Sequence, residues 1–316
     1  MNQCKEKIVI ALGGNALQDS KGPATAKAQL DVVKRTCNYI IELIKKGYQI
    51  IIVHGNGPQV GKILLAYETA SNVTPVMPFD VCGAMSQGFI GYHIQQALGA
   101  ALKENDLDIP VVTLVTQLVV NQEDPAFQNP SKPIGSFYTE EEAKVLEKEK
   151  GYTMKEDAGR GWRRVVPSPI PKKIVEIDTV KRLWDSTIVI TAGGGGIPVI
   201  EQTDGSLEGV AAVIDKDFAA ELLAEQINAD VLMILTEVEK VALNFNKPDQ
   251  KQLSEMTVDE AEQYIKEGHF SAGSMLPKVQ AAVKYANSAP GRKAIITSLY
   301  KAVEGIEGKT GTTITR

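Results

Sequence analysis

The sequence predicts a three-layer α/β sandwich, in which a mainly parallel sheet lies between two layers of helices. Short runs rich in β-branched residues alternate with amphipathic helical patterns, and this alternation is typical of such folds. The runs are almost continuously apolar, as expected for parallel strands that are buried on both faces. The predicted strands are Ile8–Leu12, Gln49–His54, Pro110–Val115, Thr187–Thr191, Val231–Thr236 and Lys293–Ser298.

The helical pattern is clearest between the first two predicted strands. Val33, Cys37, Ile40 and Ile44 keep the spacing of one helix face. Two lysines and Gly47 follow them, and such residues are typical of a helix end. We therefore predict an amphipathic helix that ends at this glycine.

One long segment interrupts the alternation of strands and helices. From about residue 118 to residue 171 the chain is rich in proline, glycine and charged residues. Compact domains rarely contain so long an irregular connection unless it serves a purpose. We therefore predict an inserted subdomain or lid here.

Composition narrows the classes of function. The 316-residue chain is 43% hydrophobic and 23% charged, which is ordinary for a globular protein, and its net charge of −5 argues against nucleic acid as a main partner. No apolar stretch reaches the length of a membrane span, so no membrane partner is expected. Cys4, Cys37 and Cys82 are too few and too scattered for a disulfide framework. This cysteine usage predicts a reducing, cytoplasmic location.

Glycine-rich loops follow four of the predicted strands, the last of them more weakly. Ligands bind at the carboxyl ends of strands in open α/β sheets, and glycine lets backbone N–H groups approach an anion closely. Tight strand–helix turns are the alternative interpretation, but several such loops together favour anion binding. The loops are Ala11–Leu17, His54–Gly61, Thr191–Pro198, which contains Gly194 and Gly195, and Ser271–Lys278.

The second loop predicts an anion site at a helix N-terminus. Pro58 suits a first helical position, which places Gly55, Asn56 and Gly57 where free N–H groups and the helix dipole favour anions. The loop is not a P-loop, because five residues rather than four separate Gly55 from the Gly-Lys pair. It also fails the dinucleotide fingerprint, because valine stands where the third glycine is required.

Lysines near the starts of predicted helices are further candidates for binding an anion. Lys216 and Lys278 lie in predicted first turns, the latter directly after Pro277, where a positive charge opposes the helix dipole at a cost of about 0.3–1 kcal/mol. A bound phosphate would reverse the sign of this effect. Asp215 or Asp217 can instead be a simple helix cap. Lys132, between two prolines of the insert, would on its own be read as a surface charge.

Together these features predict phosphoryl transfer. Basic side chains and amide loops without a nucleophile constellation suit a reaction between two anions, in which catalysis is mainly positioning and charge stabilisation, usually with Mg²⁺. The histidines, His54, His93 and His269, show no metal-ligand spacing, and the first two are expected to be structural. The arginines around Trp162 can either contact phosphate or stack on that ring.

The motifs in their order resemble the carbamate kinase family of the amino-acid kinase superfamily. The match runs from about residue 8 to the C-terminus and includes ALGGNAL, HGNGPQVG, MPFDVCGAMSQGFIGY, NPSKPIGSFY, EDAGRGWRRVVPSP, GGGGIPV, DKDFAAELLA and GSMLPKV. The resemblance implies a large, mainly parallel sheet with a protruding subdomain. It also implies the reaction ATP + carbamate ⇌ ADP + carbamoyl phosphate, run toward ATP in arginine fermentation. Members of this family are homodimers and use Mg²⁺ with ATP or ADP.

The resemblance also implies roles for individual residues. Lys216 and Lys278 would hold the transferring phosphoryl group, Asp217 would orient them, and Lys132 would reach toward the carbamoyl end. Residues 1–205, with the insert, would form the carbamate lobe, and residues 206–316 the nucleotide lobe. Donors to carbamate and phosphate would come from Gly13, Gly14, Asn15, Gly55, Asn56, Gly57, Gly194 and Gly195. The nucleotide would be bound by Thr236, Val238, Met275 and Pro277.

Three alternatives stay open at this point. The chain can be another acid kinase of the same fold, acting on acetylglutamate, glutamate, aspartate or a nucleoside monophosphate. A non-catalytic nucleotide sensor is a second alternative, although the key lysines and aspartate are all present. A dinucleotide dehydrogenase is the third, and the failed fingerprint disfavours it.

Overall fold

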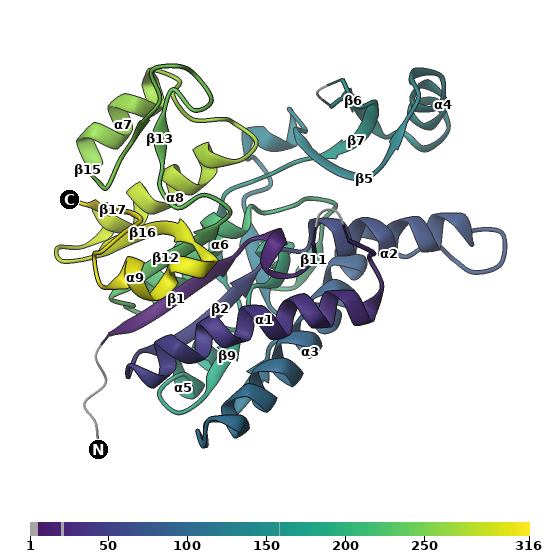
Figure 1. Ribbon diagram of the computed structural model, residues 1–316. Helices are drawn as coiled ribbons and strands as arrows, with labels where there is room; N and C mark the ends of the chain where they lie inside the picture. Colours follow the sequence, from purple (N-terminus) through teal and green to yellow (C-terminus); the bar gives the residue numbers. More distant parts are fainter. Residues whose placement is uncertain (1–5, 20–21, 158) are drawn as a thin grey trace.

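A central sheet of eight strands forms the middle of the molecule (Figure 1). The computed structural model describes residues 6–19, 22–157 and 159–316, so Cys4 lies outside the described residues. All neighbouring strands run parallel except β16 and β17. The predicted fold class is confirmed. In sheet order the strands are β15 (Glu255–Thr257), β17 (Thr312–Thr315), β16 (Lys293–Ser298), β12 (Val231–Thr236), β1 (Lys7–Leu12), β2 (Gln49–His54), β9 (Ile188–Ile190) and β3 (Val111–Thr113).

The continuous apolar runs reflect two helical layers. Successive side chains of a strand point to opposite faces, and β1 shows this directly: Ile8 and Ile10 pack into one core, while Val9 and Ala11 pack into the other. The first core is covered by α1 (Ala26–Lys45), α3 (Phe79–Glu104) and α9 (Ala302–Ile306). The second core is covered by α5 (Ile177–Leu183), α6 (Lys216–Gln226), α7 (Val258–Lys266) and α8 (Met275–Ser288).

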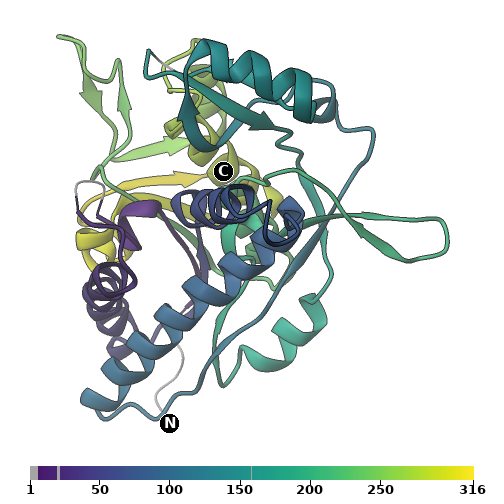
Figure 2. The same ribbon diagram turned by 90° about the vertical axis from the view of Figure 1, so that its right-hand side faces the viewer.

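The predicted insert is an ordered subdomain that stands away from the central sheet (Figures 1 and 2). Its antiparallel sheet has the order β5 (Lys132–Tyr138), β7 (Trp162–Val166), β6 (Thr153–Glu156), and α4 (Glu140–Lys150) packs beside it. The segment is therefore not an irregular connection. Its two ends, β4 (Gln117–Val120) and β8 (Pro171–Ile174), belong to another sheet with β10 (Ile197–Glu201) and β11 (Leu207–Gly209).

The insert rests on α2 (Gly57–Thr69). Ile134 of the insert is buried in a small apolar cluster with Val60 and Leu64 of this helix. The two backbones also come close together here, since a Cβ on Gly61 would be in van der Waals contact with the Cα of Gly135, at 3.4 Å. The contact holds the insert over the carboxyl edge of the sheet.

Three details of the predicted loops are wrong. Ser271–Lys278 follows helix α7 rather than a strand. α8 begins at Met275, so Pro277 is its third residue and not its first. Proline is tolerated there because the first N–H groups of a helix have no partner within the helix. Pro58 also lies later than predicted, since it is the second residue of α2 and not the first.

The remaining elements are short. They are the strands β13 (Ala242–Leu243) and β14 (Lys251–Gln252) and the 3₁₀ turns Gly14–Ala16, Pro125–Phe127, Gly193–Gly195 and Leu299–Lys301. Across the described residues, no helix is both long enough and apolar enough for a membrane span.

Candidate active site

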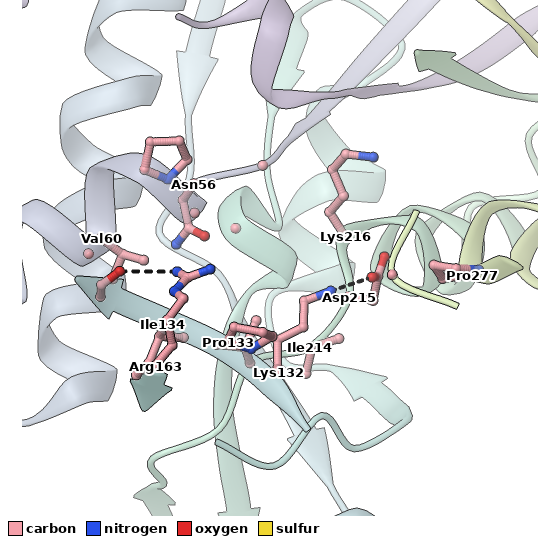
Figure 3. Close-up of a pocket in the computed structure, with 18 of the residues that line it drawn as sticks. Asn56, Val60, Lys132, Pro133, Ile134, Arg163, Ile214, Asp215, Lys216 and Pro277 are labelled. Carbon is pink, nitrogen blue, oxygen red and sulfur yellow. Dashed lines mark hydrogen bonds and ion pairs between the residues drawn. The ribbon is translucent and has the colours of Figure 1, made fainter. Parts of the chain in front are cut away.

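Two adjoining cavities open at the carboxyl edge of the central sheet. The larger, of about 650 Å³, is lined by the loop after β2, the N-termini of α2, α6 and α8, and strand β5 of the insert (Figure 3). The smaller, of about 470 Å³, is lined by the loop after β1 and the end of β12. Ser274 and Lys278 line both cavities. A ligand that filled the smaller cavity would therefore reach the larger one at Lys278.

A buried carboxylate joins two lysines at this junction. Asp217, whose side chain is 2% exposed, accepts from Lys216 Nζ through Oδ1 and from Lys278 Nζ through Oδ2 at 3.0 Å. The two lysine side chains are themselves only 13% and 17% exposed. Asp217 thus holds both ammonium groups beside the junction of the two cavities.

The electrostatics of this cluster favour an incoming anion. Burial lowers the pKa of Lys216, and the charge of Lys278 acts in the same direction, while Asp217 and Asp215 oppose both. One carboxylate between two ammonium groups leaves a local excess of positive charge. A phosphoryl oxygen would supply the missing negative charge.

Asp215 both caps α6 and receives a lysine from the insert. Its Oδ1 accepts from the backbone N–H of Asp217 at 3.0 Å, so the helix-cap interpretation is confirmed. Its Oδ2 accepts from Lys132 Nζ at 2.8 Å (Figure 3). Burial alone would raise the pKa of Asp215, but Lys132 and Lys216 lower it to about 2. Lys132 is therefore not a free surface charge, since it ties the insert to the helix that carries Lys216.

The chain is similar to known kinases over nearly its whole length. The model of the amino acid kinase family matches residues 6–298. The chain belongs to the amino acid kinase family. It is 54% identical to a carbamate kinase of Pyrococcus horikoshii over 98% of this chain and 99% of that protein. It is 55% identical to the carbamate kinase-like protein YqeA of Escherichia coli, over 98% and 99% respectively.

A solved structure of the family is also closely similar. The carbamate kinase of Giardia lamblia bound to AMP-PNP superposes with a TM-score of 0.92 at 46% identity, and the match covers 98% of each chain. The likeness thus extends over the insert as well as the central sheet.

The glycine loops of this family member pack tightly around the cavities. Gly55 and Asn56 line the larger cavity, and a Cβ on Gly55 would lie 3.5 Å from Lys216 Cδ. Gly194 has a φ of +69° and lies under the Asn56 amide, where a Cβ would come within 2.2 Å of Nδ2. Gly195 packs instead against the Ile214 carbonyl and is not among the residues that line either cavity.

The other predicted site residues divide between the two cavities. Gly57 and Pro277 line the larger one. Thr236 lines the smaller one, together with Gly13, Gly14 and Asn15. Val238 and Met275 line neither, and Met275 packs against the core. Sequence reasoning missed Ser274, whose only signal was its place before Lys278 in a glycine-containing loop.

The histidines have structural positions. His54 is buried, and its Nδ1 lies 2.8 Å from the Gly55 carbonyl oxygen. Burial lowers its pKa to about 4, against a smaller opposing effect of that contact, so the ring is neutral at pH 7. His93 packs against Phe89 and Tyr92. The structural interpretation of both residues is therefore supported.

The arginines of the insert do not stack on tryptophan as one interpretation held. Arg163 lies over the Phe137 ring at 5.0 Å, and Arg164 lies over Tyr152 at 3.7 Å. The partner rings come from other strands or from the segment before β6, which sequence spacing alone does not reveal. Arg163 also lines the larger cavity.

Proposed function

We propose that the chain catalyses reversible phosphoryl transfer between ATP and carbamate, giving ADP and carbamoyl phosphate. The observation that carries this proposal is the Asp217-bridged pair of lysines where the two cavities meet. Its relatives, more than 50% identical over nearly the whole chain, support carbamate as the acceptor. Other acid kinases of the fold lose support, because no observation at the site favours them over carbamate.

The chemistry needs charge stabilisation and no general base. In the direction of ATP formation, a β-phosphate oxygen of ADP forms a bond to phosphorus. The bond from phosphorus to the carbamoyl oxygen breaks, and its electron pair stays on the departing carbamate. Lys216 and Lys278 offset the charge on the phosphoryl oxygens, and Asp217 holds both lysines in place. Carbamate is already an anion, so no proton has to be removed from it in the reverse direction.

The two cavities suggest where each substrate binds. The smaller cavity, with Thr236 and the loop Gly13–Asn15, receives the nucleotide and directs its phosphates toward Lys278. The larger cavity, between the insert and residues Gly55–Gly57, receives carbamate or carbamoyl phosphate. In this arrangement, most residues around the carbamate belong to residues 1–205, and many of those around the nucleotide belong to residues 206–316.

Magnesium fits this site as part of the nucleotide complex. Asp215 and Asp217 are the carboxylates that line the larger cavity, and both already pair with lysines. Over the described residues, no group of three or more acidic, histidine or cysteine side chains forms a metal cluster. The phosphates of the nucleotide would therefore supply most ligands of Mg²⁺, and the ion would neutralise part of their charge.

Two further proposals concern the state of the protein in the cell. We propose that it works as a homodimer, as the family resemblance implies. We also propose a cytoplasmic location, which suits the free and buried thiols of Cys37 and Cys82. Sedimentation or light scattering would test the dimer.

The first test is ATP formation from ADP and carbamoyl phosphate with Mg²⁺, measured in a hexokinase-coupled assay. We expect robust turnover by the wild type. Lys216→Ala should lose on the order of a hundredfold in kcat, which corresponds to about 3 kcal/mol in the barrier. ADP affinity, measured by calorimetry, should fall far less, because Lys216 acts on the transferring group. Equal losses in turnover and in affinity would contradict this role.

A further inference from the structure

A short turn of the backbone packs between two of the elements that line the larger cavity. It comprises residues 192–196 and connects β9 to β10. Gly194 of this turn lies against the Asn56 amide at the N-terminus of α2. Gly195 packs against Ile214, where a Cβ would come within 2.0 Å of the carbonyl oxygen. Because Ile214 lies just before the N-terminus of α6, the turn sets the spacing between α6 and the loop after β2.

The backbone of this turn has an unfavourable conformation at Ala192. This buried residue has a φ of +50° and a ψ of +33°, a left-handed conformation in which its Cβ is crowded. Four glycines follow it, so the turn has no larger side chain of its own to hold it in place. Unfavourable backbone conformations persist where the surrounding structure enforces them, and they concentrate at functional sites. The residues that hold this turn from outside are therefore candidates for a role in the reaction.

Thr116 is bonded to both ends of the turn. It is fully buried and lies between β3 and β4, where the chain leads into the insert. Its Oγ1 accepts from the Ala192 N–H at 3.0 Å and donates to the Leu114 carbonyl at 2.9 Å. Because the Thr116 proton is used there, the Thr191 hydroxyl, 2.7 Å away, donates to the same oxygen. The carbonyl oxygen of Thr116 accepts from the Ile197 N–H at 2.9 Å, directly after the turn.

Gln87 connects Thr116 and the middle of the turn to α3. It is 1% exposed. Its Oε1 accepts from the Thr116 N–H at 2.9 Å, and its Nε2 donates to the carbonyls of Thr116 at 3.1 Å and Gly193 at 2.9 Å. These contacts use both amide protons and the amide oxygen, and they fix the orientation of the amide. The turn is thus attached to a long helix of the core rather than to another loop.

We propose that Thr116 and Gln87 are positioning residues for phosphoryl transfer. Neither is among the residues that line the two cavities, so they act on the reaction through the turn. They fix the turn, and the turn keeps the start of α6, which carries Lys216, at a defined distance from the loop after β2. Catalysis that is mainly positioning loses rate when a group moves by about 1 Å. The inference rests on the proposed function and adds residues outside the cavities to it.

Variants of Thr116 test its hydroxyl separately from the rest of the side chain. Thr116→Val keeps the shape of the side chain but leaves the Ala192 N–H without its partner. In ATP formation from ADP and carbamoyl phosphate, its kcat should fall about tenfold. Its KM for ADP should stay within about twofold, because the turn does not line the smaller cavity. Thr116→Ser keeps the hydroxyl, and its kcat should stay within about threefold of the wild type.

A matched threonine separates positioning from folding. Thr312 is also fully buried, and its Oγ1 accepts from the Val241 N–H at 2.8 Å and donates to the Leu253 carbonyl at 2.6 Å. Thr312→Val should lower the free energy of unfolding about as much as Thr116→Val but leave kcat within about twofold. Equal losses of kcat in the two valine variants, or a Thr116→Ser variant as slow as Thr116→Val, would overturn the positioning role.

Gln87→Met tests the same turn from the side of α3 and does not depend on Thr116→Val being folded. It removes three hydrogen bonds at similar side-chain volume, and its kcat should also fall about tenfold. Because both residues act through one turn, the double variant should lose little more than either single variant. Amide hydrogen exchange in residues 192–197 should be faster in both single variants and unchanged in Thr312→Val. Additive losses of kcat, or unchanged exchange in both, would show that the two residues do not act through the turn.

The activity of the wild type distinguishes this inference from the proposed function. An active wild type, with unchanged kcat in Thr116→Val and Gln87→Met, overturns the positioning role and leaves the proposed function standing. A wild type that forms no ATP while it still binds ADP rejects the proposed function itself, and the positioning role with it.

Discussion

At the scale of single residues, the site depends on one carboxylate shared by two ammonium groups. Asp217 is more buried than either lysine that it holds, so its charge acts in a medium that screens it weakly. The same pattern occurs at the surface, where Glu307 pairs with Lys46 at 2.6 Å and with Lys309 at 2.7 Å. These two carboxylates differ in burial, so variants of the two show how burial at the cavity changes the effect of a carboxylate on its paired lysines.

Asp217→Asn should make the reaction sensitive to alkaline pH. Asp217 raises the pKa of Lys216 against burial and the charge of Lys278, so its loss should lower that pKa further. Lys216 would then lose its proton at a lower pH, and the alkaline limb of the kcat profile should move to lower pH. We also expect kcat at pH 7 to fall on the order of a hundredfold.

The pH profile of kcat for the wild type and Asp217→Asn measures this shift. The matched control is Glu307→Gln, which removes a carboxylate from two lysines at the surface and should leave the profile unchanged. An alkaline limb at the same pH in Asp217→Asn and the wild type would show that Asp217 does not control the charge of Lys216.

At the scale of elements, helices α6 and α8 carry Lys216 and Lys278 on their N-terminal turns, and a second ion pair joins the two helices further along. Lys284 of α8 lies 2.6 Å from Glu221 of α6, whose side chain is fully buried. Glu221 follows Asp217 by four residues and therefore lies on the same face of α6. The two helices are thus joined by ion pairs at two points along their length.

This second ion pair should affect stability as a function of pH. Burial raises the pKa of Glu221 to about 7, although Lys284 opposes the shift. An acid with a raised pKa in the folded state binds more protons when folded, so the free energy of unfolding falls as pH rises from about 4.5 to about 7. The loss amounts to at most about 3 kcal/mol. Glu221→Gln cannot ionise, so relative to the wild type it should be more stable at pH 8 than at pH 5.

Urea unfolding at pH 5 and pH 8 tests this expectation. Glu304→Gln serves as the control, because Glu304 pairs with Lys301 at 3.0 Å and its side chain is 39% exposed, whereas that of Glu221 is fully buried. If the difference between Glu221→Gln and the wild type is the same at both pH values, the buried carboxyl does not titrate in this range.

At the scale of the whole molecule, the sequence predicted the features that depend on local patterns. It missed the contacts that depend on pairing between distant segments of the chain. The alternation of Ile8 and Val9 between two cores explains why the strand prediction was right. The partner of Arg163 was not predictable, because Phe137 reaches it through an irregular antiparallel pairing that brings separate segments together. Which cavity each predicted residue lines could also not be told without the fold, because Gly14 and Gly55 come from neighbouring loops yet line different cavities.

The insert and the C-terminal half meet through the contact of Lys132 with Asp215, and this contact should control closure over the cavity. Lys132→Ala removes the ion pair, so the insert loses one of its attachments to α6. We expect a lower kcat together with faster amide hydrogen exchange in β5 and β7, while exchange in β1 and β12 stays unchanged. Lys144→Ala is the matched control, because Lys144 is largely exposed and pairs with Glu140 at 2.7 Å within the insert itself. The expected pattern requires both readouts to change in Lys132→Ala and neither in Lys144→Ala. A lower kcat with unchanged exchange would make Lys132 a ligand of the carbamoyl end without a role in closure, and unchanged kinetics would remove it from the site.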